Sequence, residues 1–405
     1  MIVYTHPNPP KGRAFCQNTK SDILNTIQFM KKILRISTVP MSLDTFCEGL
    51  LKKLSEDYEV VAVSSPDPEL ETIREREGVR TIAVPMERHI SLWRDIKALV
   101  KMIGVMRRER PDIVHSITPK AGLVSMMAAW LTRVPVRMHT YTGLVFPTST
   151  GMKQRILIWM DKLLCRCATY INPEGQGVAD DLKRFHITKK PLHIIGNGNV
   201  RGVDMNYWNR DQVTRDVRKE LDIAPTDIVL LFVGRLVGDK GINELVEAFA
   251  RIEEKSIKLL LVGPKEENLD PLKQETLERI ESDPRIIAVG SQTDVRPYYV
   301  AADIFVFPSY REGFPNTVLE AGALGLPSIV TDINGSREII IEGKNGTIVP
   351  SKDADALYKA ILLLINDEET RKEMAEQARS LVASRYEQQW LWGELMKVYN
   401  SFEKV

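Results

Sequence analysis

The sequence lacks any long hydrophobic run. No stretch of about 18 or more apolar residues occurs, so no membrane-spanning helix is expected. Residues 1–29 are polar and contain several prolines, without the apolar core of a secretory signal peptide. We expect residues 1–30 to form a disordered extension, or to precede a start at Met30. A cytoplasmic protein is predicted.

Cysteine is scarce. The four cysteines form no Cys-x-x-Cys pair and no cluster with histidine at zinc-site spacing: Cys16, Cys47, Cys165 and Cys167. Neither a disulfide framework nor a structural metal site is therefore predicted, and a reducing compartment fits this pattern.

Two common nucleotide-binding loops are also missing. No Gly-x-x-x-x-Gly-Lys-Ser/Thr sequence occurs, and no Gly-x-Gly-x-x-Gly follows the first predicted strand. The fragment Gly196-Asn-Gly198 lies instead where two domains are expected to join. A dinucleotide oxidoreductase is thus the weakest candidate. Because no Asp-x-Asp metal motif accompanies the candidate site residues, we expect activity without a divalent cation or other cofactor.

Charge is nearly balanced overall but uneven along the chain. Residues 1–200 hold 29 Lys and Arg against 19 Asp and Glu, whereas residues 201–405 hold 26 against 35. A basic first half favours an anionic partner, either a membrane surface or a phosphorylated acceptor. Two basic amphipathic stretches, Leu92–Arg110 and Met152–Cys167, either lie in a membrane interface or pack on a sheet. No nucleic-acid partner is predicted.

Short β-branched runs alternate with helical patterns from Lys31 onward, which is typical of βαβ units and a parallel sheet. The predicted strands of the first half are Lys32–Thr38, Glu59–Ser64, Thr81–Val84, Asp112–Ile117, Val136–Thr140, Thr169–Asn172 and His193–Gly196. Helical patterns lie between them, for example at Leu92–Arg108 and Ala121–Leu131.

After a polar passage the alternation begins again. The predicted strands of the second half are Ile228–Gly234, Lys258–Val262, Ile286–Val289, Ile304–Pro308, Ser328–Thr331 and Gly346–Val349. The fold class is therefore α/β, with Rossmann-like domains at residues 31–200 and 201–385. Residues 386–405 form a helix expected to cross back to the first domain. Ligands should bind at the carboxyl ends of the strands, in a cleft between the two sheets.

Two glutamates with seven residues between them follow one of these strands in the string Glu312-Gly313-Phe314-Pro315-Asn316-Thr317-Val-Leu-Glu320. Gly313 and Pro315 delay the helix until about Asn316, so Glu312 lies on a loop and Glu320 about one turn into a helix. Free backbone N–H groups at the helix start suit a phosphate or sugar hydroxyls, and each carboxylate can accept hydrogen bonds from further hydroxyls. Either glutamate alone would fit an ordinary surface position.

A glycine-rich turn carries two cations after another strand. Arg235 and Lys240 flank this turn, which immediately precedes the predicted helix Ile242–Ala250. Cations at a helix N-terminus can neutralise a diphosphate. A plain surface turn with two cations is an equally good interpretation of this segment alone.

Together the two segments resemble retaining glycosyltransferase family 4, enzymes of the GT-B fold, from Lys31 to the C-terminus. The resemblance implies that Arg235 and Lys240 bind the donor diphosphate and that Glu320 holds the ribose. Glu312 and the backbone of Gly313, Phe314 and Pro315 would hold the donor sugar, with Asn316 and Thr317 near the phosphates. One departure is that the first strand runs into Ser37–Met41 without the glycine-rich loop of many members.

Two histidines lie at predicted strand ends in the first half. The family keeps a cleft histidine near His139, which makes His139 a catalytic candidate beside Arg235, Lys240 and Glu312. A lone histidine is more often structural, so His115, with Lys120 of the following helix, is only an acceptor-side candidate.

The predicted reaction moves a hexosyl group, expected to be an N-acetylhexosamine carried by UDP, to a hydroxyl of a glycan acceptor. The resemblance favours a polyprenyl-diphosphate-linked acceptor in surface or capsular polysaccharide synthesis, with peripheral contact at the inner face of an anionic membrane. A GDP-mannose donor remains open. The alternatives are a sugar-nucleotide 2-epimerase of the same fold and a non-catalytic protein that binds nucleotide sugars.

Overall fold

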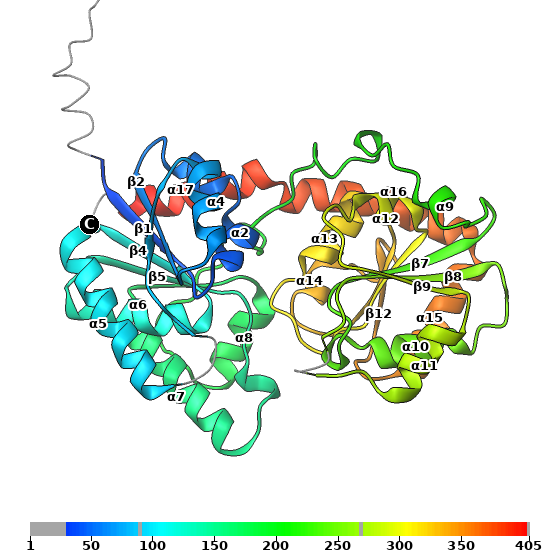
Figure 1. The fold of residues 1–405 in the computed structure, drawn as a ribbon, viewed down its shortest axis with the longest axis horizontal. Helices are drawn as coiled ribbons and strands as arrows, with labels where there is room; N and C mark the ends of the chain where they lie inside the picture. The colour runs from blue at the N-terminus through cyan, green and yellow to red at the C-terminus, as the bar shows by residue number, and fades with distance from the viewer. Residues whose placement is uncertain (1–29, 88–90, 267–269, 403–405) are drawn as a thin grey trace, which may run out of the picture.

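Two parallel β-sheets organise the chain (Figure 1). The computed structural model describes residues 30–87, 91–266 and 270–402. Of the extension predicted over residues 1–30, residues 1–29 lie outside these ranges. Each sheet has six strands with helices on both faces, so the predicted pair of doubly wound α/β domains is confirmed.

The N-terminal sheet has the strand order β3-β2-β1-β4-β5-β6. Its strands are β1 (Lys32–Ile36), β2 (Glu59–Ser64), β3 (Arg80–Ala83), β4 (Ile113–Ile117), β5 (Val136–Tyr141) and β6 (Tyr170–Pro173). Its helices are α2 (Pro40–Cys47), α3 (Leu50–Leu54), α4 (Pro68–Glu77), α5 (Leu92–Glu109), α6 (Pro119–Leu131), α7 (Gly151–Cys167) and α8 (Gln176–Arg184), with a 3-10 turn η1 (Phe146–Thr148) before α7.

The C-terminal sheet has the order β12-β11-β10-β7-β8-β9. Its strands are β7 (Ile228–Val233), β8 (Ile257–Val262), β9 (Ile286–Gly290), β10 (Ile304–Phe307), β11 (Ser328–Thr331) and β12 (Gly346–Val349). The helices are α9 (Val217–Glu220), α10 (Ile242–Ala250), α11 (Gln274–Ser282), α12 (Arg296–Ala301), α13 (Asn316–Ala323), α14 (Ser336–Ile339), α15 (Ala354–Asn366) and α16 (Glu368–Tyr386), with 3-10 turns η2 (Arg210–Gln212) and η3 (Gly238–Lys240).

The central strands β7, β8 and β10 of the C-terminal sheet are almost wholly apolar because helices cover both faces of that sheet. In β8, for example, the side chains from Leu259 to Val262 are all buried. One continuous core surrounds the C-terminal sheet, whereas the N-terminal sheet has a separate core on each face. Within the described ranges no helix combines the length and apolar character needed to cross a bilayer.

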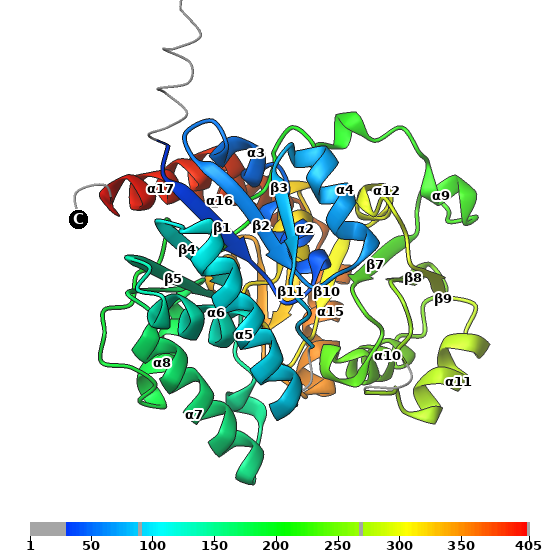
Figure 2. The same cartoon turned by 60° about the vertical axis from the view of Figure 1, so that its left-hand side comes forward.

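The last helix, α17 (Gln388–Ser401), leaves the C-terminal domain and packs on the N-terminal one (Figures 1 and 2). Leu391, Trp392, Leu395 and Tyr399 of α17 belong to the same core as residues of β1, α2 and α3. At the crossing, Val203 N donates to Tyr386 O at 2.9 Å and Gln388 N donates to Val203 O at 3.0 Å. The two segments that connect the domains are thus hydrogen-bonded to each other.

The predicted strand His193–Gly196 is wrong. Leu192, the residue before this segment, makes one isolated bridge with Ile171, and the segment itself is a loop. Gly196 and Gly198 both have positive φ, which ends extended pairing after the first contact. The other predicted strands are present, with ends shifted by no more than two residues.

Candidate functional site

The loops after β7 and β10 meet at the centre of the C-terminal sheet, where these strands are neighbours. Gly241 joins η3 to α10 with φ +73°, and an added Cβ there would overlap the backbone carbonyl of Pro308. Only glycine allows this close approach of the two loops. The approach brings the glycine-rich turn and the two-glutamate string to one place, as the sequence predicts for strand ends.

Lys240 and Glu312 form an ion pair across these loops: the Lys240 ammonium contacts Glu312 Oε1. The same carboxylate oxygen accepts a hydrogen bond from Ser309 Oγ at 2.8 Å. The ammonium also lies 5.5 Å from the centroid of the Phe307 ring. Both side chains are largely shielded from solvent, so their charges occupy fixed positions at the strand ends.

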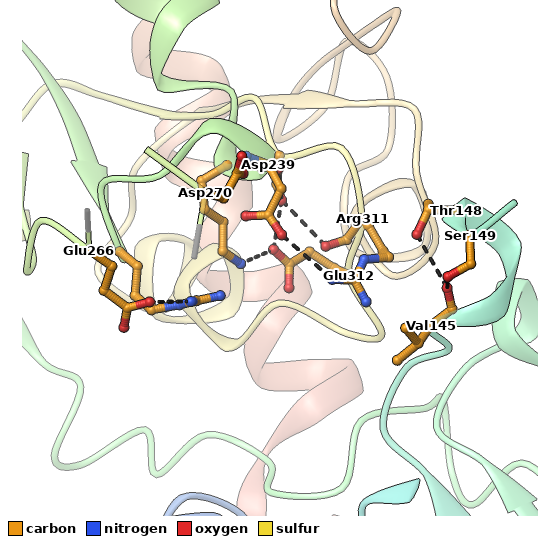
Figure 3. Close-up of polar contacts among 11 residues, drawn as sticks. Val145, Thr148, Ser149, Asp239, Glu266, Asp270, Arg311 and Glu312 are labelled. Carbon is orange, nitrogen blue, oxygen red and sulfur yellow. Dashed lines mark hydrogen bonds and ion pairs between the residues drawn. The ribbon is translucent and has the colours of Figure 1, made fainter. Parts of the chain in front are cut away.

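Arg235 points elsewhere in this structure. Its guanidinium donates to Glu266 Oε2 at 2.7 Å, and about half of its side chain is exposed. Arg311 lies 3.5 Å from Asp239 in a second ion pair (Figure 3). In this structure Arg235 is therefore paired with Glu266 and not with the Lys240–Glu312 pair.

A cavity of about 480 Å³ opens beside Glu312. The C-terminal domain contributes Arg311, Glu312 and Asn334 to its walls, and the N-terminal domain contributes Thr148 and Asp181. Figure 3 shows the segment with Val145, Thr148 and Ser149 facing the loop that carries Arg311 and Glu312. The cavity is therefore a cleft between the two domains.

Glu320 is buried one turn into α13. Its Oε1 accepts from Arg201 at 2.9 Å and its Oε2 from Tyr299 Oη at 3.3 Å. Burial raises the pKa of Glu320, and the charge of Arg201 opposes this shift. Glu320 and Arg201 line a different cavity, of about 550 Å³, so the two glutamates of the string do not share one cavity here.

Gly313, between the two glutamates, lies at a close contact between the domains, and its neighbours in the string are packed or hydrogen-bonded. A Cβ added to Gly313 would lie 2.6 Å from the carbonyl carbon and oxygen of Thr142. Phe314 is buried against Tyr386, with ring centroids 5.5 Å apart. Pro315 precedes the helix, Asn316 Oδ1 accepts from Asn199 Nδ2 at 2.9 Å, and Thr317 offers its carbonyl to Tyr299.

His139 has the surroundings of a structural histidine in this structure. Its ring is buried beneath α6, with Nδ1 2.8 Å from Ser116 Oγ and an edge-to-face contact with Tyr141. Burial lowers its pKa to about 3, so the ring is neutral. It reaches neither cavity described above, and its catalytic role stays a prediction.

His115 and Lys120 are buried as well. His115 bonds to Thr140 Oγ1 at 2.7 Å and to Tyr399 Oη at 2.5 Å, beneath α17. Burial and the Arg35 charge hold the pKa of His115 well below its usual range. Lys120 Nζ lies 2.6 Å from Asp95. In this structure His115 is packed in the core and Lys120 forms an ion pair with Asp95. The acceptor-side role of both residues stays a prediction.

An Asp-x-Asp sequence does occur away from the site, at Asp353-Ala-Asp355. Asp353 accepts a hydrogen bond from Ala356 N at 2.9 Å as the N-cap of α15, and Asp355 pairs with Arg251. Both carboxylates therefore have a structural role in this position.

Several residues at the domain junction were not identified from the sequence. Glu338 of α14 accepts from the backbone of Gln176 at 2.5 Å and Gly177 at 2.9 Å, at the start of α8 in the other domain. Glu174, directly after β6, is 3% exposed and its Oε2 has no hydrogen-bond partner among the described residues. Burial, with the nearby Glu312 and Glu338, raises the pKa of Glu174 well above its ordinary value.

Comparison with known proteins agrees with this arrangement. The model of the family "Glycosyl transferases group 1" matches residues 213–381, and that of "Glycosyl transferase 4-like domain" matches residues 44–198. The capsular polysaccharide biosynthesis glycosyltransferase CapM of Staphylococcus aureus is 32% identical over 92% of this chain and 98% of its own.

A second relative and a solved structure extend the comparison. The N,N'-diacetylbacillosaminyl-diphospho-undecaprenol α-1,3-N-acetylgalactosaminyltransferase of Campylobacter jejuni is 24% identical over 90% of this chain and 97% of its own. The crystal structure of Anabaena Alr3699/HepE in complex with UDP has a TM-score of 0.77 at 19% identity, covering 92% of this chain and all of that chain.

Proposed function

The chain is a glycosyltransferase that belongs to the glycosyl transferases of group 1, and we propose that it moves a hexosyl group from a UDP-sugar to a lipid-linked glycan. The observation that carries the proposal is the Lys240–Glu312 pair at the adjoining ends of β7 and β10, beside a cleft walled by both domains. A fixed cation next to a fixed carboxylate suits a sugar diphosphate, which combines an anionic group with hydroxyls.

The donor is proposed to be a UDP-linked N-acetylhexosamine. Support comes from a structural neighbour that was crystallised with UDP and from a relative named as an N-acetylgalactosaminyltransferase. We assign the donor diphosphate to Lys240 and Arg235, the sugar hydroxyls to Glu312 and the ribose to Glu320. Arg235 and Glu320 must then exchange their present partners, Glu266 and Arg201, for the donor.

The acceptor is proposed to be a polyprenyl-diphosphate-linked glycan used for surface polysaccharide, at the cytoplasmic side of an anionic membrane. Relatives named for capsule synthesis and for a diphospho-undecaprenol acceptor support this assignment. The basic first half of the chain would meet the membrane.

The proposed reaction retains the anomeric configuration without a covalent enzyme intermediate. The bond between the anomeric carbon and the β-phosphate oxygen breaks, and the acceptor oxygen bonds to the same face of that carbon. The acceptor proton passes to the leaving diphosphate. Lys240 and Arg235 stabilise the charge that develops on the diphosphate, which is the main catalytic contribution expected of such cations.

A thermal-shift screen with UDP-, GDP-, ADP- and dTDP-sugars tests the donor, because a ligand that binds the native state raises its melting temperature. We expect a shift with UDP-N-acetylhexosamine that Glu320→Ala abolishes. With a polyprenyl-diphosphate-linked sugar present, UDP and an extended lipid should appear together. Formation of an epimeric nucleotide sugar without acceptor would instead indicate a 2-epimerase. Binding without UDP release would indicate a non-catalytic protein that binds nucleotide sugars.

A further inference from the structure

Exposed apolar side chains gather on one face of the N-terminal domain. Of the fourteen large hydrophobic side chains exposed in the described part of the chain, nine belong to α5, α6 and α7. These three helices lie side by side on the same face of the sheet (Figure 2). Such clustering is unlike the single, scattered apolar residues of an ordinary surface.

The exposed residues form one stripe on each outer helix. On α5 the apolar members of the stripe are Leu92, Trp93, Ile96 and Val100, and on α7 they are Met152, Ile156 and Trp159. Trp93 is 77% exposed and Trp159 is 64% exposed. Residues three or four apart fall on one side of a helix, so each stripe is a continuous strip of surface. We call the two stripes together the α5–α7 face.

Basic residues stand beside these apolar side chains. Lys97, Lys101 and Arg107 on α5, and Lys153, Arg155 and Lys162 on α7, form no ion pair with any described residue. Arg94 is paired with Glu87, and Arg108 contacts Glu109. The α5–α7 face therefore carries net positive charge among its exposed apolar groups.

The acidic residues of both helices turn away from this face. Asp95 binds Lys120 of α6, and Glu109 binds Lys32 and Arg80 at the edge of the sheet. Asp161 of α7 is held by the buried Tyr141. Only Glu109 also contacts a basic residue of the face, Arg108, and none of these carboxylates pairs with the other lysines and arginines of the face.

The α5–α7 face also adjoins the cleft. The 3-10 turn η1 leads directly into α7, and its residues Pro147 and Thr148 line the cavity beside Glu312. Met152 and Trp93 lie near the N-terminal ends of α7 and α5, which is the end of the domain where the strands finish. Any partner bound to the α5–α7 face would therefore lie beside the entrance of the cleft.

We propose that the α5–α7 face docks on an anionic phospholipid bilayer, with Trp93 and Trp159 inserted at the headgroup level and the lysines and arginines on lipid phosphates. A second copy of the chain is a poorer occupant, because a two-fold contact would bring two positive faces together. The inference rests on the proposed function for the lipid-linked acceptor, whose diphosphate would then enter the cleft from the bilayer surface.

The test is flotation of the full chain with vesicles of phosphatidylglycerol and phosphatidylcholine, against phosphatidylcholine alone. We expect binding to the anionic vesicles that weakens at high salt. Trp93→Ala with Trp159→Ala, and separately Lys97→Glu with Lys101→Glu, should each weaken it about tenfold or more. Matched controls on other surfaces are Trp390→Ala and the pair Lys344→Glu with Lys359→Glu, which should bind as the wild type does.

Absence of vesicle binding by the wild type, or unchanged binding by both face variants, would overturn the inference. So would a dimer in sedimentation that the double tryptophan variant converts to a monomer. UDP-sugar thermal shifts on the same samples separate the two proposals. A donor shift without vesicle binding rejects only the docking face, and vesicle binding without donor shift or transfer rejects only the proposed function.

Discussion

The ammonium of Lys240 contacts the carboxylate of Glu312 between loops that follow two adjacent central strands, 72 residues apart in the chain. Lys240 belongs to the glycine-rich turn after β7, and Glu312 belongs to the string after β10. The sheet brings the two side chains together because β7 and β10 are neighbouring strands. Both side chains are mostly shielded, and removal of either would leave its partner poorly compensated.

Lys240→Ala should lower kcat/KM for transfer by about 100- to 1000-fold, about 3–4 kcal/mol, because the leaving diphosphate loses its fixed cation. Glu312→Gln keeps the shape but not the charge and should also lower kcat/KM strongly. Steady-state kinetics with both single variants and the double variant measures their coupling. Additive losses would show that the two side chains act independently. Lys344→Ala, an exposed lysine on the same domain, is the control.

Arg201 and Glu320 form the second ion pair of the region. Arg201→Ala should destabilise the ligand-free protein by about 1–3 kcal/mol, because Glu320 stays buried without its cation. Added UDP-sugar should restore part of the loss if the ribose hydroxyls replace the guanidinium. Thermal unfolding with and without donor measures both effects. Arg279→Ala, an exposed arginine, is the matched control, and an unchanged melting temperature for Arg201→Ala would contradict the account.

The variant Gly313→Ala tests whether the close contact between the domains is needed for transfer but not for donor binding. The new methyl group would meet the Thr142 carbonyl of the other domain, so the domains must move apart to accommodate it. We expect kcat to fall at least tenfold while the UDP-induced thermal shift is largely kept. Gly104→Ala on α5 is the control, because no atom lies within 4 Å of a Cβ added there. Transfer at the wild-type rate by Gly313→Ala would show that this contact is dispensable.

Glu174→Gln should change how stability depends on pH. The folded pKa of Glu174 is raised, so between the unfolded pKa and the folded pKa the native state keeps a proton that the unfolded state has lost. This stability is fully present below the unfolded pKa and declines as pH rises. Gln cannot ionise, so the melting temperature of the variant should gain on the wild type from pH 5 to pH 8. If the melting temperatures of the wild type and of Glu174→Gln changed with pH in parallel, the pKa of Glu174 would not be raised in the folded state.

Activity without a divalent cation is a further expectation. Lys240 and Arg235 are proposed to supply the positive charge that a metal would otherwise place on the diphosphate. Treatment with a chelator should therefore leave kcat within about twofold of the untreated enzyme. Loss of turnover that magnesium restores would reject this expectation while leaving the donor assignment intact.

Features that are local in the sequence were predicted well. The start of α13 at Asn316 follows from Gly313 and Pro315, and the placement of both motifs follows from the strands before them. Pairings between distant segments were missed: Arg201 with Glu320, and Glu338 with the start of α8. The spacing of these residues in the sequence does not indicate their contacts, because the contacts depend on how the two domains face each other.

The histidines show a different difficulty. The sequence predicts His139 at the end of a strand, where a cleft residue belongs, but β5 continues to Tyr141, and the small Gly122 lets α6 approach until the ring is covered. The amino-acid sequence of the strand does not show whether the His139 side chain is exposed or covered by a helix. Only the distance between helix and strand distinguishes them, and that distance is a property of the packed domain.

The return of α17 to the N-terminal domain affects when that domain can finish folding during synthesis. Its core lacks Leu391, Trp392, Leu395 and Tyr399 until almost the whole chain has left the ribosome. Tyr399 also forms hydrogen bonds with Arg35 and His115. The first domain to be translated is thus the last to be completed, and a ribosome that stalls within the C-terminal domain leaves both domains unfinished.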